Sequence, residues 1–278
     1  MTARLGAALG LLAFLALGAA CDGTSDADAR ADVRHAMLSD LATRVIEPGH
    51  ARFVTEAGTL ASATATLDAD PTAANLEAAR EAWTNAALAW QRLAALNLPG
   101  VKFGLYHNRI ATRPANVEGV ETLLAGGETL DAAFIEGRGS NVRGLPVLEY
   151  LLFADDATLS APRRRAYARA AGADVLAQAE ALQTKWAADG GDEIGMFLAA
   201  DTEGRNLQSS VSRVVNEMVM VAEDLRYNEI GRPLGVARTP EETGGEPRPD
   251  LVQAPYAGVS AALYRETLAG IRALMTAD

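Results

Sequence analysis

The sequence predicts an all-α protein, and three observations support this fold class. Apolar residues recur three, four and seven positions apart, the spacing that places them on one face of a helix. No stretch alternates apolar and polar residues for long enough to predict a strand. Alanine is abundant and aromatic residues make up only 5% of the chain, a composition that suits helices better than strands. Long helices joined by short links favour antiparallel bundles.

The N-terminal segment predicts export. Arg4 precedes an apolar run and a few small residues that end at Cys21. The pattern over residues 1–20 is that of a signal peptide, because an apolar core of about 13 residues is shorter than the roughly 20 needed to cross a bilayer. Cys21 is the only cysteine, and its position resembles a lipobox. We therefore expect acylation of Cys21 and a lipid anchor facing the periplasm, on either membrane; the alternative is an ordinary secretory signal followed by a chance cysteine.

The charge of the remaining chain is strongly negative. Loss of the signal removes Arg4 and leaves 24 basic and 36 acidic residues, a net charge of −12 against −11 for the whole chain. This balance argues against nucleic-acid binding and suits the attraction of cations. Residues 21–32 are acidic and lack large apolar side chains, which predicts a flexible tether. With one cysteine no internal disulfide can form, so stability must come from a packed core.

Two long helical regions follow the tether. Residues 33–47 and 52–67 are predicted to form a helix pair, or one helix kinked at Pro48. The next helix carries large apolar residues seven apart, namely Leu76, Trp83 and Trp90. This spacing predicts a core seam rather than a ligand platform.

The rest of the chain also reads as helices, with one irregular link. Apolar stripes at helical spacing cover residues 176–186, 211–225 and 264–275. Shorter helices are predicted over residues 117–124, 130–136, 147–153 and 193–199. The link 231–255 holds five prolines and four glycines. Loops of that length tend to be functional or disordered.

The segment 143–153 is the most informative part of the sequence. Glu149 is its only carboxylate and lies in an apolar run, with Arg143 at the start as the only other charge. A carboxylate removed from water needs a charged or polar partner, a metal or a raised pKa. We therefore expect Glu149 to be at least partly buried and matched by polar groups, a bound cation or an arginine, with Arg109 and Arg113 as alternatives to Arg143. The other interpretation is an ordinary glutamate on a helix surface.

This segment resembles the Gly-x-His-x-x-Glu-Tyr-Leu-Leu signature of imelysin-like proteins, which are periplasmic proteins tied to iron uptake and once classed as metallopeptidases. The matching residues are Gly144, Glu149, Tyr150, Leu151 and Leu152. Pro146 stands where that family has histidine. Further segments resemble the family in the same order along the chain, namely 45–48, 71–91, 226–235 and 256–263. The resemblance covers most of residues 33–275.

The resemblance implies two packed helical bundles with a site at their interface. We expect the first bundle, with the motif, over residues 33–157 and the second over 158–278, the second either small or incomplete. The candidate ligand-binding residues are Glu149, Gly144, Arg109, Arg113 and Ser260. Iron or another divalent cation is the candidate cofactor, with Glu149 as the only candidate ligand.

Two features argue against a metal site. Proline at position 146 offers no ligand, whereas a histidine there would share a helix face with Glu149. His35, His50 and His107 are scattered, without the spacing of a zinc or iron ligand set.

Three functions remain open. The first is a periplasm-facing lipoprotein of imelysin type that binds a ligand or partner in iron acquisition without catalysis. The second is a metallopeptidase of the imelysin type, and the third is a structural or adaptor bundle without a working site. The missing histidine counts against the second, so we expect no catalytic residues and no peptidase activity. The implied partners are a membrane, through the anchor, and an iron-transport component, with no nucleic acid.

Overall fold

The computed structural model describes residues 26–93, 105–199, 209–236 and 245–277. Within these ranges the regular elements are helices and no strand occurs, so the all-α prediction is confirmed. None of the described helices is long and apolar enough to span a bilayer. The predicted signal segment 1–20 and Cys21 lie outside the described residues.

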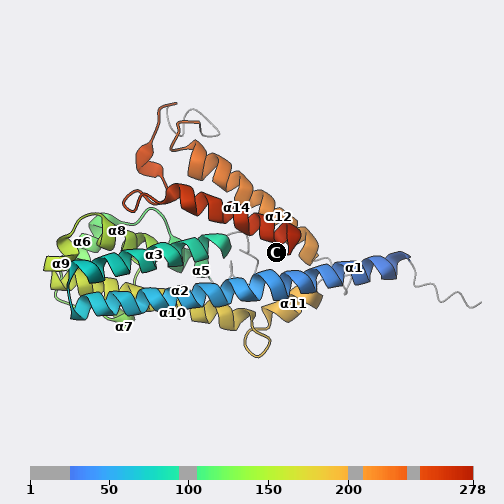
Figure 1. Cartoon of the computed structure of the whole chain (residues 1–278), viewed down its shortest axis with the longest axis horizontal. Coiled ribbons are helices and arrows are strands. Elements are labelled where there is room, and N and C mark those ends of the chain that lie inside the picture. Colours follow the sequence, from blue (N-terminus) through green and yellow to red (C-terminus); the bar gives the residue numbers. More distant parts are fainter. Residues whose placement is uncertain (1–25, 94–104, 200–208, 237–244, 278) are drawn as a thin grey trace, which may run out of the picture.

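The first helical region is continuous. Helix α1 (Asp26–Leu41), a π-helical turn η1 (Ala42–Ile46) and α2 (Glu47–Ala69) follow one another without a loop (Figure 1). Pro48 lies in the first turn of α2, and the π turn before it shifts the bonding register at the point where proline has no N–H to donate. The predicted flexible tether is helical from Asp26 onward, because its acidic residues alternate with alanines that favour a helix.

Three long helices pack side by side. They are α2, α3 (Ala73–Leu93) and α10 (Pro162–Trp186), with α2 packed against both others. The rings of Phe53 and Trp90 lie 5.1 Å apart in this core. Trp83 and Trp90 are both buried, which confirms that their stripe is a core seam.

Short helices cover one end of this layer. They are α5 (Tyr106–Ala111), α6 (Val117–Ala125), α7 (Ala132–Glu136), the 3-10 turn η3 (Ser140–Val142), α8 (Gly144–Phe153) and α9 (Ala157–Ser160). Helix α8 packs against α3 and α10, and the Trp83 Nε1–H donates to the Leu145 carbonyl at 2.8 Å. It begins three residues before the predicted start at 147, with Pro146 in its first turn, where a missing N–H breaks no helical bond.

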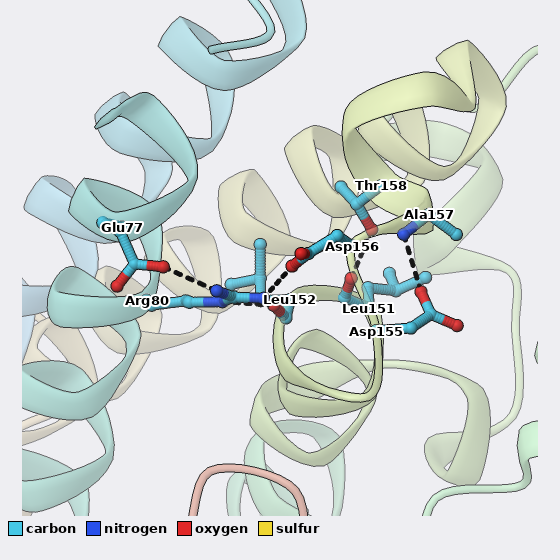
Figure 2. Close-up of polar contacts among 8 residues, drawn as sticks. All are labelled: Glu77, Arg80, Leu151, Leu152, Asp155, Asp156, Ala157 and Thr158. Carbon is cyan, nitrogen blue, oxygen red and sulfur yellow. Dashed lines mark hydrogen bonds and ion pairs between the residues drawn. The ribbon is translucent and has the colours of Figure 1, made fainter. Parts of the chain in front are cut away.

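The far end of α8 is fixed by polar contacts (Figure 2). Arg80 of α3 donates from Nε to the Leu152 carbonyl at 2.7 Å and pairs with Asp156 at 2.9 Å. The Thr158 hydroxyl donates to the Leu151 carbonyl. Because these carbonyls end the helix, the contacts satisfy acceptors that would otherwise lack a partner.

The last two long helices of the chain, α12 and α14, pack against each other. Helix α11 (Glu193–Ala199) precedes α12 (Ser210–Asp224), a π-helical turn η4 (Leu225–Gly231), a 3-10 turn η5 (Pro249–Leu251) and α14 (Ser260–Thr276). Figure 1 shows α14 beside α3 and α12 beside α14, and α14 packs against both α3 and α12. Helix α10, expected in a second bundle over 158–278, instead packs against α2 and α8. The boundary between the two groups of packed helices therefore falls after α10 and not at residue 157.

Candidate functional site

Gly144 lies where α8 meets α5, and the backbone there requires glycine. Its φ is +79°, in the left-handed region that side chains disfavour. A Cβ here would also collide with the carbonyl oxygens of Ile110 and Arg109, the latter at 2.7 Å. The structure therefore accounts for Gly144 by the close approach of two helices.

Glu149 joins α8 to the loop that precedes α14. Its side chain is only 3% exposed. One carboxylate oxygen, Oε1, accepts hydrogen bonds from the backbone N–H of Tyr256 at 2.8 Å and of Ala257 at 3.0 Å. These partners lie more than 100 residues along the chain, on the α14 side of the molecule. Glu149 is therefore a buried carboxylate at the contact between the two parts of the fold.

The environment of Glu149 acts on the pKa of its carboxyl group in two opposing directions. Burial raises the pKa of the Glu149 carboxyl above its usual range. The two backbone N–H groups and the positive charge of Arg113 oppose this effect and limit the rise in pKa. Burial dominates, so the folded protein stabilises the protonated carboxyl relative to water.

Arg143 is not the partner of Glu149, although it is the nearest arginine in sequence. Its guanidinium pairs with Asp174 of α10, with Nε donating to Oδ2 at 2.9 Å and Nη2 donating to Oδ1. Both side chains are buried, at 3% and 5% exposure. Arg143 precedes the first helical residue of α8, so its side chain points to α10 and away from the helix face that carries Glu149.

The other two arginines come from the segment before the motif, Arg109 in α5 and Arg113 just after it. Arg109 Nη1 donates to Gln178 Oε1 of α10 at 3.3 Å. Arg113 forms a two-bond ion pair with Glu229 of η4, at 2.7 and 2.5 Å. Of the three candidate arginines, Arg113 is the one whose charge acts on Glu149.

A cavity of about 280 Å³ lies beside Glu149. Its polar lining includes Glu149, Arg113, Glu229, Arg232, Asp250 and Gln253, and Pro146 and Tyr256 add apolar surface. The lining comes from α8, from α6 and the segment before it, from η4 and from the loop before α14, so the cavity lies at the contact between the two parts of the fold. A small polar ligand in this cavity could contact both acidic and basic side chains.

Ser260 supports the loop of this cavity. Its Oγ accepts from the Ala254 N–H at 3.2 Å, across the segment that carries the N–H groups bonded to Glu149. Tyr256 also packs against Tyr150, with ring centroids 5.6 Å apart. In the structure Ser260 holds the loop and lies outside the cavity lining.

The residues around Glu149 do not fit iron or another divalent cation. Within the described ranges of the chain, no group of three or more His, Cys, Asp or Glu side chains is arranged to hold a metal ion. Glu149 uses Oε1 for backbone N–H groups, and Glu229 uses both oxygens for Arg113. His50 is far from the motif and packs against Trp186, where burial lowers its pKa to about 4 and keeps it neutral.

Several residues of the site carried no signal in the sequence. Glu229 and the N–H groups of Tyr256 and Ala257 lie far from the motif, and a backbone N–H has no residue type that marks it. The one available signal was the irregular link 231–255, which was expected to be functional or disordered and supplies Arg232, Asp250 and Gln253. Part of that link, residues 237–244, lies outside the described residues.

The fold and the site together define an all-helical protein whose motif carboxylate is buried between packed helices. The sequence profile of the imelysin family (Peptidase_M75) matches residues 46–278. The chain therefore belongs to the imelysin family, as its motif suggested.

Known proteins extend this comparison. The chain is 27% identical over 237 residues to iron-regulated protein A of Synechococcus elongatus, covering 83% of this chain and 62% of that protein. It therefore spans less than two thirds of that curated relative. An imelysin-like protein from Psychrobacter arcticum has a TM-score of 0.74 at 21% identity, covering 88% of this chain and 74% of that one. An iron-regulated protein A precursor from Parabacteroides distasonis has a TM-score of 0.71 at 17% identity, covering 87% and 73%. Both structures support the fold.

Proposed function

We propose that this chain is a non-catalytic ligand- or partner-binding protein of imelysin type that acts in iron acquisition. The observation that carries the proposal is the setting of Glu149. This carboxylate is buried beside a cavity of about 280 Å³, and the histidine position of the motif is occupied by Pro146. The cavity thus offers charged and polar groups for binding, and the residues that the structure describes around it include no ligand set for metal-assisted hydrolysis.

The role in iron acquisition rests on relatives. The curated relative from Synechococcus elongatus and the solved protein from Parabacteroides distasonis are both described as iron-regulated protein A. Deletion of the gene is expected to lower the uptake of radiolabelled iron by iron-starved cells, and wild-type protein supplied in trans should restore it. Unchanged uptake at limiting iron would contradict this role.

The purified protein is expected to show no peptidase activity. A metallopeptidase needs several ligands around a metal with one open position, and Pro146 removes the ligand that the motif would supply. The assay measures cleavage of a general protein substrate with and without added Zn²⁺ or Fe²⁺. Metal-dependent cleavage that disappears in Glu149→Ala would support the metallopeptidase alternative.

The proposal places the protein on a membrane, facing the periplasm. It rests on the signal-like segment and on Cys21, since two or three acyl chains would hold a protein stably on a bilayer. We expect wild-type protein in the membrane fraction and Cys21→Ser to differ from it in size, because processing at the cysteine is lost, as followed by fractionation and immunoblotting. Processing and release of Cys21→Ser at the same size as wild type would contradict the anchor.

A further inference from the structure

Arg232 lines the cavity of about 280 Å³ beside Glu149, at the end of η4. Its Nε is buried and has no hydrogen-bond partner among the described residues. Its guanidinium also forms no ion pair within the part of the chain that the structure describes. The other arginine on the lining, Arg113, is already paired with Glu229. Arg232 thus keeps a buried, charged N–H donor that lacks an acceptor, which is unfavourable unless a ligand supplies one.

The acidic residues on the same lining already have partners. They are Glu149, Glu229 and Asp250. Glu149 accepts from two backbone N–H groups of the loop before α14, and Glu229 uses both oxygens for an arginine. Asp250 is exposed and pairs with the arginine two residues before it, at 2.6 Å. The acceptor for Arg232 must therefore come from outside these side chains.

The shape of a guanidinium indicates which acceptor suits Arg232. Nε–H and one Nη–H form a planar fork that matches the two oxygens of a carboxylate. Hydrogen bonds to an ionised oxygen are also about twice as strong as those between neutral groups. A phosphate fits the same fork, but it carries up to two negative charges at neutral pH, beside the carboxylates of Glu149 and Glu229. The lining therefore favours a group with a single negative charge.

Gln253 sets a second requirement. Its side chain is 9% exposed and lines the cavity, and its amide Oε1 is buried without a hydrogen-bond partner among the described residues. A carbonyl oxygen can only accept, so the ligand must carry a donor, and a hydroxyl group supplies one. Pro146 and Tyr256 offer apolar surface to a carbon skeleton. The volume lies just below the roughly 300 Å³ at which typical small-molecule sites begin, so the ligand must be small.

We infer that this cavity binds a small hydroxy acid with one carboxylate. The carboxylate accepts from the Arg232 fork, and the hydroxyl donates to Gln253 Oε1. The inference rests on the proposed function, because it names the class of ligand for the cavity beside Glu149. A bare metal cation would leave the Arg232 N–H without an acceptor, and an acid without a hydroxyl would leave Gln253 without a donor.

Isothermal titration calorimetry of the full chain in iron-free buffer tests the inference. L-lactate and D-gluconate are the probes. Propanoate lacks the hydroxyl of lactate, sorbitol lacks the carboxylate of gluconate, and inorganic phosphate is the competing anion. We expect a Kd below about 1 mM for at least one hydroxy acid. Its matched control and phosphate should each bind at least tenfold more weakly, because each leaves one of the two buried groups unsatisfied or adds charge beside the carboxylates.

Variants locate the site. Arg232→Lys keeps the charge but removes the fork, and Gln253→Met removes the acceptor, so each should weaken hydroxy-acid binding at least tenfold. Arg272→Lys changes an exposed arginine of α14 that does not line the cavity, and it should bind as wild type does. The unfolding midpoints of all three variants should match wild type.

Three results would overturn the inference. They are no binding of either hydroxy acid, equally tight binding of propanoate, sorbitol or phosphate, and wild-type affinity in both Arg232→Lys and Gln253→Met. The titration contains no iron, so its failure is distinct from a failure of the proposed function, which is measured as iron uptake by cells.

Discussion

Replacing Arg143 by methionine is expected to lower the free energy of unfolding by about 3–5 kcal/mol. The guanidinium and the Asp174 carboxylate are both buried and joined by two hydrogen bonds. Gln178 adds a third bond, from its Nε2 to Asp174 Oδ1 at 3.3 Å. Removing the arginine leaves a charged carboxylate in the core, which costs far more than the packing lost with the side chain.

Urea denaturation of matched variants checks this result. Arg44 makes an exposed ion pair with Asp40 at 3.4 Å, so Arg44→Met should cost at most about 1 kcal/mol. The double variant Arg143→Met/Asp174→Leu should recover most of the loss, because both buried charges are gone. If Arg143→Met cost no more than Arg44→Met, the buried ion pair would not contribute as described.

Gly144→Ala is expected to destabilise the protein by about 3 kcal/mol or more, from backbone strain and from overpacking against α5. The left-handed φ of +79° alone accounts for about 1–2 kcal/mol. The collision of the new methyl group with two backbone carbonyls accounts for the rest, since neither carbonyl can move without shifting α5. Displacement of α8 should also weaken the contact between Glu149 and the loop before α14.

Two other glycines separate these contributions. Gly258 has a φ of +68°, and a methyl group added there would meet no heavy atom within 4 Å, so Gly258→Ala should cost about 1–2 kcal/mol from backbone strain alone. Gly127 has neither feature, and Gly127→Ala should lie within about 0.5 kcal/mol of wild type. Thermal and urea unfolding of the three variants give the comparison. Equal losses in Gly144→Ala and Gly258→Ala would show that the contact with α5 is looser than the structure indicates.

The local features of the fold could be predicted from the sequence. Helical spacing identified the seam of Trp83 and Trp90 and the helices α12 and α14. The buried residues of a helix recur at a fixed spacing, which can be seen in the sequence. The setting of Glu149 in an apolar run indicated its burial. Pro146 marked the start of α8, since proline is tolerated in a first turn.

The long-range features could not be predicted. Asp174 lies in a helix with several polar residues and is indistinguishable in sequence from a surface aspartate, so its pairing with Arg143 was missed. The groups bonded to Glu149 are backbone N–H groups, which every residue but proline carries. The place of α10 in the fold depends on which helix it packs against. A stripe of apolar residues shows that a helix is packed but does not identify the helix that it contacts.

Glu149→Gln separates the charge of Glu149 from its structural role. A glutamine carbonyl can accept from the N–H groups of Tyr256 and Ala257, so the loop should keep its place. The pKa of Glu149 is raised in the folded state, so the stability that its protonated carboxyl gives the folded protein at low pH is lost as pH rises through that raised pKa. A neutral side chain should therefore not lower stability at neutral pH.

The most direct test of the proposed function is the uptake of radiolabelled iron by iron-starved cells that carry Glu149→Gln in place of wild type. The variant must first match wild type in cellular amount and in unfolding midpoint. We expect uptake to fall towards that of the deletion strain, because the binding site has lost its buried carboxylate. Wild-type uptake by this variant would contradict a binding role for Glu149 and would leave it as a structural link between α8 and the loop before α14.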